Sequence, residues 1–403
     1  MTKAQRDIEI INFLFSRFNL SVTSYYEGTN VNQYRVRFPY DIDINDLFNM
    51  QGNLIAGLHD NDVIVKQDED ELVIETKGDG KILTMNEVFY KSMYTRTNDF
   101  RLVLGKDTEN NSITTLLPKA QHMLISECSG SEKTQLLHCF IASLLLGAET
   151  HYLILIAPKG NEFNVYKDID TVEFIDDVSA GIQTLQWLVE EMNARYRIMS
   201  QQNTSDITKT NLTRIVCIID EFADLIKKEP GIEKDVVLLT QKAGACGIHL
   251  IIGTQYPDVK VLTGPVKANV PTRICLKVNS KVQSEIVLGL SGGEKLLGYG
   301  DMLYLGKGMN DPVRIQAPYI SDEDKLHVIR IVTPQLEGLG PKKQEKAAPE
   351  KVSYDHLIHP DKPKPERKRV GLIQGLINIM NAPPCTTPND FTAMRASHRW
   401  NKT

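Results

Sequence analysis

Lys133 and Thr134 close the stretch ECSGSEKT in the order in which a phosphate-binding loop ends. In the pattern G-x-x-x-x-G-K-[ST], backbone N–H groups wrap the α- and β-phosphates, the lysine reaches the β- and γ-phosphates, and the hydroxyl holds Mg²⁺. Both glycine positions are occupied here by glutamates, Glu127 and Glu132. A carboxylate about 4 Å from a phosphate charge costs on the order of 4 kcal/mol at an effective dielectric constant near 20. The stretch by itself leaves two interpretations open, a phosphate-binding loop and a plain capped helix start.

Two acidic residues follow a later hydrophobic segment. RIVCII is followed directly by Asp220 and Glu221. Enzymes that hydrolyse nucleotides in a phosphate-binding loop use an aspartate in this place to coordinate Mg²⁺, and a further residue to orient the attacking water. Two acids after a strand can also form a solvated turn, but their pairing with the Lys-Thr pair upstream favours the catalytic interpretation. A further candidate strand, IHLIIG, is followed by Thr254 and Gln255, where a polar side chain is placed to sense the γ-phosphate.

The elements that must position these residues are short apolar strands that alternate with helices from about residue 99 to 335. The candidate strands are HMLIS, YLILIA, RIVCII, IHLIIG, RICLKV and MLYL. Such alternation predicts an α/β fold, with a mostly parallel sheet covered by helices on both faces. HMLIS comes before the loop and TQLLHCFIASLLLGA after it, which supplies the strand, turn and helix that a phosphate-binding loop requires.

One helix between these strands is predicted from its periodicity. GIQTLQWLVEEMNARYRIMS has apolar residues at helical spacing, which is typical of an amphipathic helix with one buried face. Its methionine and aromatic stripe is predicted to be core rather than a binding site. The predicted core residues are Ile182, Leu185, Leu188, Val189, Met192, Tyr196 and Met199.

The two ends of the chain differ in character from this central part. Residues 1 to about 98 predict a small α+β domain, with a helical pattern in RDIEIINFLFSRF and alternating strands in QYRVRF, DVIVKQ and ELVIET. Residues from about 336 to 403 are rich in Lys, Pro and Glu, which predicts a linker or a disordered tail. Within it, VGLIQGLINIM, near 370–380, predicts a short amphipathic helix that docks either on the domain or on a partner.

Composition narrows the class of protein. A length of 403 residues with 41% hydrophobic residues supports one large or two ordinary domains with proper cores. The formal net charge of −5 argues against a protein that coats nucleic acid through a globally basic surface, although a local basic lining is compatible with it. The longest apolar run, CFIASLLLGA, is shorter than a membrane span, so a cytoplasmic protein is expected. The six cysteines form no C-x-x-C pair, and neither zinc nor disulfides are expected.

Long segments of the chain resemble the FtsK/SpoIIIE family of DNA translocases, hexameric ring motors that pump double-stranded DNA. The resemblance runs from about Leu104 to about Ile320. It is carried by PKGNEFNVYKDI, LQWLVEEMNARYRIM, VCIIDEFADLI, QKAGACGIHLIIGTQYPDVKVLTGPVKANVPTRICLKVNSKVQSEIVLG and GGEKLLGYGDMLYLGKGMNDPVRI. It implies a RecA-like P-loop NTPase fold and an ATP-dependent double-stranded DNA translocase subunit, in a homo- or hetero-hexamer. The region before Leu104 would correspond to the family's small α domain.

The resemblance also implies a role for each candidate residue. Lys133 would bind the β- and γ-phosphates of ATP, and Thr134 and Asp220 would hold Mg²⁺. Glu221 would activate water, and Gln255 would sense the γ-phosphate. The ATP-binding loop would consist of Ser129, Gly130, Ser131, Glu132, Lys133 and Thr134.

DNA contacts are implied for the loops around QQNTSDITKT and PDVKVLTGPVKAN. The candidates are Lys209, Lys260 and Lys267, although each lysine taken singly is more readily explained as a solvated surface charge.

The sequence also departs from the family. Gly244, Tyr256 and Glu285 stand where arginines are usual, and Ala157 stands where an aspartate is usual. An arginine finger is worth roughly 10³ to 10⁵ in the rate of phosphoryl transfer, so its loss is expected to impair hydrolysis. The alternative hypothesis is therefore a catalytically degenerate paralogue that acts as a DNA-binding or ring-scaffold subunit. A small-molecule kinase is disfavoured, because the matched segments extend well past the nucleotide site.

Overall fold

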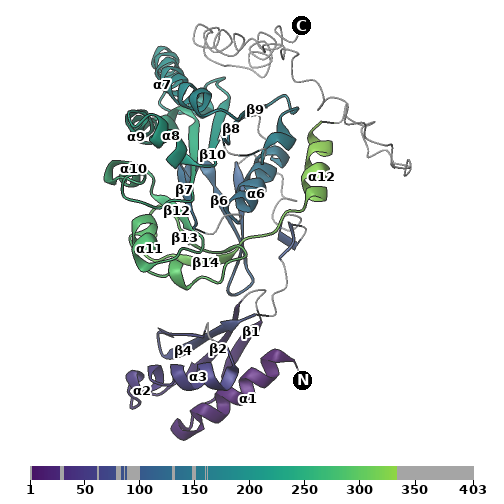
Figure 1. The fold of residues 1–403 in the computed structure, drawn as a ribbon, viewed down its shortest axis with the longest axis vertical. Coiled ribbons are helices and arrows are strands. Elements are labelled where there is room, and N and C mark those ends of the chain that lie inside the picture. Colours follow the sequence, from purple (N-terminus) through teal and green to yellow (C-terminus); the bar gives the residue numbers. More distant parts are fainter. Residues whose placement is uncertain are drawn as a thin grey trace, which may run out of the picture.

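The computed structural model describes residues 2–27, 31–60, 63–78, 83–85, 87–88, 100–128, 132–147, 151–158, 160 and 162–333 (Figure 1). The predicted tail from 336 to 403, with its helix near 370–380, lies outside these residues. So do Ser129, Gly130 and Ser131 of the predicted ATP loop. Among the described residues, none of the helices is long and apolar enough to cross a membrane.

The N-terminal part builds a small sheet with helices packed against it (Figure 1). Its four strands have the order β1-β2-β4-β3, and every pairing is antiparallel. Residues from both helices and strands form one apolar core, which includes Ile11, Tyr34, Leu54 and Leu72. The elements are α1 (Lys3–Phe15), β1 (Ser24–Glu27), β2 (Val31–Arg37), α2 (Ile44–Phe48), α3 (Gln51–Leu58), β3 (Ile64–Asp68) and β4 (Glu71–Lys77).

The second part is built on a ten-stranded sheet of order β6-β5-β14-β13-β12-β7-β11-β10-β8-β9. All pairings from β12 to β9 are parallel. The predicted α/β fold with a mostly parallel, helix-covered sheet is confirmed. The strands are β5 (Arg101–Asp107), β6 (Ser112–Leu116), β7 (Met123–Ser126), β8 (His151–Ile156), β9 (Val172–Ile175), β10 (Arg214–Ile219), β11 (Ile248–Thr254), β12 (Thr272–Cys275), β13 (Asp301–Leu305) and β14 (Val313–Gln316).

The segment MLYL differs from the other candidate strands. It lies in β13, which pairs antiparallel with both β12 and β14. The chain between β12 and β13 forms α11 (Lys281–Leu288) and a short 3-10 turn, and it does not return to the other edge of the sheet before β13 begins. The start of β13 therefore lies at the same edge as the carboxyl ends of β7 and β12.

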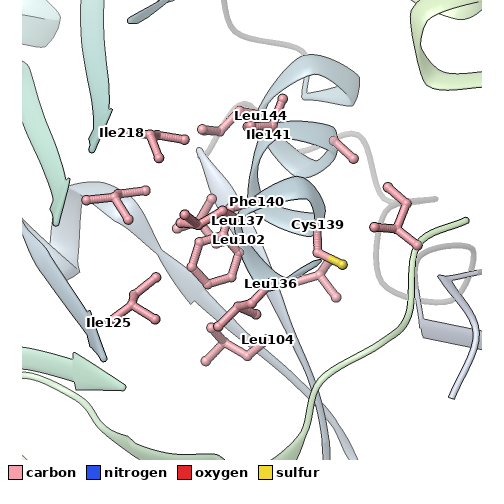
Figure 2. Packing of buried hydrophobic residues seen from close by; sticks show 14 of the residues in the cluster. Leu102, Leu104, Ile125, Leu136, Leu137, Cys139, Phe140, Ile141, Leu144 and Ile218 are labelled. Atoms are coloured by element: carbon pink, nitrogen blue, oxygen red, sulfur yellow. The ribbon is translucent and has the colours of Figure 1, made fainter. Parts of the chain in front are cut away.

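Helices cover both faces of this sheet (Figure 1). Alternate residues of β10 point to opposite faces, so Val216 and Ile218 belong to one core cluster and Ile215 and Ile219 to the other. The first cluster includes the buried face of α6, where Leu137, Phe140 and Ile141 lie near Ile125 and Ile218 (Figure 2). The helices are α5 (Leu117–Ala120), α6 (Glu132–Leu146), α7 (Val178–Gln201), α8 (Phe222–Lys228), α9 (Ile232–Lys242), α10 (Gly264–Asn269), α11 and α12 (Asp322–Val332).

The predicted amphipathic helix is confirmed as α7. Its first turn is capped by Asp177, whose side chain accepts a hydrogen bond from the backbone N–H of Ala180. Of the predicted stripe, Ile182, Leu185, Leu188, Met192 and Met199 are buried, while Val189 and Tyr196 pack partly buried against the same cluster.

A buried ionic contact links the two parts of the chain. Arg314 on β14 donates to Glu75 on β4 over 2.7 Å, and it also binds Asp301 over 2.7 Å. Lys66 reaches the same Glu75 carboxylate over 2.7 Å. Burial raises the pKa of Glu75, but the opposite charges of Arg314 and Lys66 outweigh burial and leave the pKa below its ordinary value. The small sheet is therefore attached to the large sheet by a charged carboxylate.

Candidate nucleotide site

Three adjacent strands bring the predicted nucleotide-site residues to one edge of the sheet. β11 lies between β7 and β10, and all three run parallel, so their carboxyl ends meet. β7 leads into α6, whose first turn contains Lys133 and Thr134. β10 ends immediately before Asp220. Gln255 follows the end of β11.

Lys133 crosses β11 to reach Asp220. Its Nζ donates to the Asp220 backbone carbonyl over 2.5 Å and to Asp220 Oδ1 over 2.6 Å. The side chain of Lys133 is fully buried. Gly253 of β11 makes room for it, because a Cβ there would lie 2.6 Å from the Asp220 carbonyl oxygen and 3.2 Å from Lys133 Cδ. The lysine predicted to bind phosphate and the aspartate predicted to bind the metal ion are thus in direct contact.

Glu127, at the first glycine position, points into the loop. Its side chain is fully buried, and its Oε2 accepts a hydrogen bond from the backbone N–H of Lys133 over 2.9 Å. Backbone N–H groups of this loop are the groups that wrap phosphates in the G-x-x-x-x-G-K-[ST] pattern. A carboxylate of the chain itself therefore holds an N–H that a bound phosphate would need.

Glu132, at the second glycine position, is the first residue of α6. Its Oε1 accepts a hydrogen bond from the backbone N–H of Tyr299, in the loop before β13. Its Oε2 is buried and has no hydrogen-bond partner among the described atoms. Neither glutamate is a surface residue turned away from the site, since each carboxylate has a specific donor.

Glu221 is bound from two directions. Its Oε1 accepts from the Thr254 hydroxyl over 2.8 Å and from the backbone N–H of Ala223 over 3.2 Å, which caps α8. Its Oε2 accepts from the backbone N–H of Gln255 over 2.9 Å. The sequence did not reveal the bond from Thr254, and the only signal for it was a hydroxyl residue at the end of the neighbouring strand. The carboxylate next to Asp220 is thereby connected to the segment that follows β11.

Comparison with known proteins is consistent with this geometry. Residues 87–214 match the FtsK/SpoIIIE family. DNA translocase SftA from Bacillus subtilis (strain 168) is 32% identical over 351 residues, which cover 81% of this chain and 37% of that protein. DNA translocase SpoIIIE from the same organism is 32% identical over 361 residues, 83% of this chain and 46% of that protein. The chain belongs to the FtsK/SpoIIIE family. The family resemblance predicted from the sequence is confirmed, and the chain spans less than half the length of these relatives.

Solved structures show the same fold as this FtsK/SpoIIIE family member. The pCW3 conjugation coupling protein TcpA, in its monomer form with ATPγS, superposes with a TM-score of 0.58 at 25% identity. That match covers 81% of this chain and 99% of TcpA. The cytoplasmic domain of the Thermomonospora curvata type VII secretion ATPase EccC gives a TM-score of 0.54 at 18% identity, over 67% of this chain and 36% of that one. The predicted P-loop ATPase fold is confirmed.

The three lysines predicted to contact DNA do not lie together in this FtsK/SpoIIIE chain. Lys209 ends a 3-10 turn whose Ile207 side chain lies against Gly247, just before the amino end of β11. Lys260 follows the carboxyl end of β11, and Lys267 lies on α10. Lys209 and Lys260 are exposed, whereas Lys267 is half-buried. The structure thus separates Lys209 from Lys260 by the length of β11.

Two buried histidines lie at the opposite edge from the nucleotide site. His122 Nδ1 accepts from the backbone N–H of Leu250 over 3.0 Å, and His249 Nδ1 lies 2.8 Å from the Gln121 carbonyl oxygen. Burial lowers the pKa of His122 to about 3 and that of His249 to about 4. Gly244, predicted to replace an arginine of the family, lies beside this pair, since its Cβ would be 3.5 Å from His122 Nε2. These histidines support the fold and are distant from the phosphate loop.

Proposed function

We propose that this chain is an ATP-dependent double-stranded DNA translocase subunit. The observation that supports it best is the contact between Lys133 and Asp220 across β11, which joins the phosphate-binding and metal-binding functions at one edge of the sheet. Family membership supplies the class of reaction. The alternative of a degenerate scaffold is not favoured, because the lysine, the aspartate and Glu221 are all held in buried, specific contacts.

The donor set fits MgATP. Mg²⁺ prefers oxygen ligands and is usually bound by one or two protein groups together with substrate phosphates. Thr134 and Asp220 offer a hydroxyl and a carboxylate at the same edge of the sheet. When bound, the ion would neutralise charge on the β- and γ-phosphates. Lys133 would release Asp220 and turn to the phosphates, which leaves the aspartate free for the metal.

Glu221 and Gln255 would couple hydrolysis to movement. To orient a water molecule, Glu221 must give up at least one of the bonds it accepts from Thr254 and Gln255. Those two residues begin the segment that leads to Lys260 and then to Lys267 on α10. Changes at the γ-phosphate would in this way reach the lysines proposed to contact the DNA backbone. A homo- or hetero-hexameric ring around the DNA is proposed from the resemblance.

The cellular role proposed from the resemblance is chromosome segregation in the cytoplasm. A second candidate is a role in conjugation. The match to the conjugation coupling protein TcpA supports it, because that match spans nearly the whole of the TcpA chain.

The test is ATP hydrolysis by the purified protein with Mg²⁺, with and without double-stranded DNA. Hydrolysis stimulated by DNA is expected, and both Lys133→Ala and the isosteric Glu221→Gln should abolish it. Lys325→Ala, on α12 and outside the site, is the matched control and should retain it. Absence of hydrolysis in the folded wild-type protein at saturating DNA would refute an active motor.

The DNA contacts have a separate readout. Removing a lysine that neutralises a phosphate should lower the slope of log affinity against log salt concentration by about 1. Lys260→Ala and Lys267→Ala are expected to do so, with ATP hydrolysis in the absence of DNA unchanged. An unchanged salt slope in both variants would exclude these lysines as backbone contacts.

A further inference from the structure

An exposed tyrosine lies at the same sheet edge as the nucleotide site. Tyr299 precedes β13, and the start of that antiparallel strand meets the carboxyl ends of β7 and β12. The residue is 84% exposed. Aromatic rings of this size normally bury their apolar surface, so an exposed ring beside a ligand site is a candidate contact for the ligand.

The backbone of Tyr299 is fixed although its ring is free of packing. Its N–H donates to Glu132 Oε1 at the start of α6, and its carbonyl oxygen accepts from Gln316 Nε2 over 2.7 Å. Its φ of 55° lies in the left-handed region, which tyrosine rarely adopts. Gly298 and Gly300 on either side also have positive φ. Contacts from α6 and β14 therefore hold this residue in an uncommon conformation that presents the ring outward.

The strand order decides which part of a nucleotide would meet this ring. Asp220 and Glu221 follow β10, on one side of β7, whereas Tyr299 precedes β13, on the other side. A nucleoside triphosphate held by Lys133 with its γ-phosphate toward Asp220, in an extended conformation, would place its sugar and base on the side of β7 away from Asp220. That direction leads over β12 to the loop of Tyr299.

We propose that Tyr299 stacks on the base of the bound nucleoside triphosphate, and that Glu132 is the residue that positions it. This inference rests on the proposed nucleotide binding and adds the base contact to it. Stacking of a base on an aromatic ring uses the π-face that every base has, so it contributes affinity with little discrimination between bases. It also gives Glu132 a function in place of the glycine of the loop pattern.

The experiment compares two ligands that differ in the base and sugar. Affinities of ATPγS and of inorganic tripolyphosphate are measured by calorimetry with Mg²⁺ for the wild type, Tyr299→Ala and Tyr299→Phe. Tyr299→Ala is expected to weaken ATPγS about 5- to 100-fold and to leave tripolyphosphate unchanged, and Tyr299→Phe should restore ATPγS. Tyr40→Ala, a fully exposed tyrosine in the N-terminal part, is the control and should bind like the wild type.

Each outcome separates the inference from the proposed function. Equal ATPγS affinity in the wild type and Tyr299→Ala, or an equal loss for both ligands, would overturn the base contact while leaving nucleotide binding intact. A wild-type protein that binds neither ligand would refute the proposed function itself, and the base contact with it.

Glu132 has its own readout as a positioning residue. The measured quantity is the ratio of ATPγS affinity to tripolyphosphate affinity, which cancels the effect of the glutamate charge on phosphates. Glu132→Gln keeps an oxygen acceptor for the Tyr299 N–H, so the ratio should stay as in the wild type. Glu132→Ala removes the acceptor and should lower the ratio toward that of Tyr299→Ala. An unchanged ratio in Glu132→Ala would show that Glu132 does not position the ring.

Discussion

Replacement of Glu127 by glycine is expected to tighten nucleotide binding. In the structure the buried Glu127 carboxylate accepts the backbone N–H of Lys133 over 2.9 Å. A phosphate that enters the loop needs the same N–H, so it must first displace the carboxylate. Glu127→Gly removes this competitor and restores the residue type of the loop pattern.

The magnitude follows from the bond that must be broken. A hydrogen bond to a charged acceptor contributes about 1.5–3 kcal/mol net, which corresponds to roughly 10- to 100-fold in affinity. Repulsion between the carboxylate and a phosphate adds to this, on the order of 4 kcal/mol at 4 Å and an effective dielectric constant of 20. A side chain that rotates into water escapes most of the repulsion. The hydrogen bond therefore sets the lower bound, at about tenfold tighter binding.

The assay is calorimetric titration of ATPγS with Mg²⁺ into the wild type, Glu127→Gly, Glu127→Gln and Glu323→Gln. Glu127→Gln keeps the shape and an oxygen acceptor but loses the charge, so its affinity should lie between those of the wild type and the glycine variant. Glu323→Gln removes the same charge from an exposed position on α12 and should bind like the wild type.

The free energy of unfolding, measured without nucleotide, is a second test, and it should change in the opposite direction to the affinity. Glu127→Gly leaves the Lys133 N–H without the Glu127 carboxylate, so its free energy of unfolding should fall while its affinity for ATPγS rises. Equal ATPγS affinity in all four folded proteins would refute the competition. Weaker binding by a folded glycine variant would mean that Glu127 supports the nucleotide site instead of blocking it.

Three further predictions concern the stability of the fold. Gly253→Ala should lower the free energy of unfolding by about 1–3 kcal/mol, measured by urea titration, because its Cβ would lie 2.6 Å from a carbonyl oxygen. Gly52→Ala, where a Cβ would have nothing within 4 Å, should not lower it. The pKa of Glu75 lies below its ordinary value of 4.5, so its stabilisation is present above that pH and lost below it. Thermal stability should therefore fall less steeply with acid in Glu75→Gln than in the wild type. The pKa of His122 is lowered from 6.5 to about 3, so stability should fall as pH drops below 6.5, by up to about 1.4 kcal/mol per unit, and His122→Asn should flatten that fall in urea titrations at several pH values.

The sequence predicted the parts of the site that depend on local pattern. The stripe of α7 has the periodicity of an amphipathic helix, and the apolar strands are short buried runs separated by helical patterns. Because the strands are parallel, residues that follow them converge on one edge. This is why Lys133, Asp220 and Gln255, far apart in the chain, lie at one edge of the sheet.

Contacts that depend on the direction in which a side chain points could not be predicted from the sequence. The sequence showed that Glu127 replaces a glycine, but not that its carboxylate turns inward to Lys133. The bond between Glu132 and Tyr299 joins residues 167 positions apart and depends on β13 being antiparallel, which the pattern of MLYL does not reveal. The direction of a strand is decided by the connection that precedes the strand. The periodicity of its residues carries no information about that direction.

Loss of both glycines does not by itself exclude phosphate binding, because the two positions impose different requirements. Glycine is required where the backbone must adopt a positive φ or come very close to a ligand. Glu132 lies in the first turn of α6 and has helical backbone, so no conformational penalty attaches to its side chain. The Glu127 carboxylate replaces an external anion on the Lys133 N–H. The obstacle to ATP is then one of charge and competition rather than of backbone strain. A neutral side chain of the same shape at position 127 should remove the charge but keep part of the competition for the Lys133 N–H.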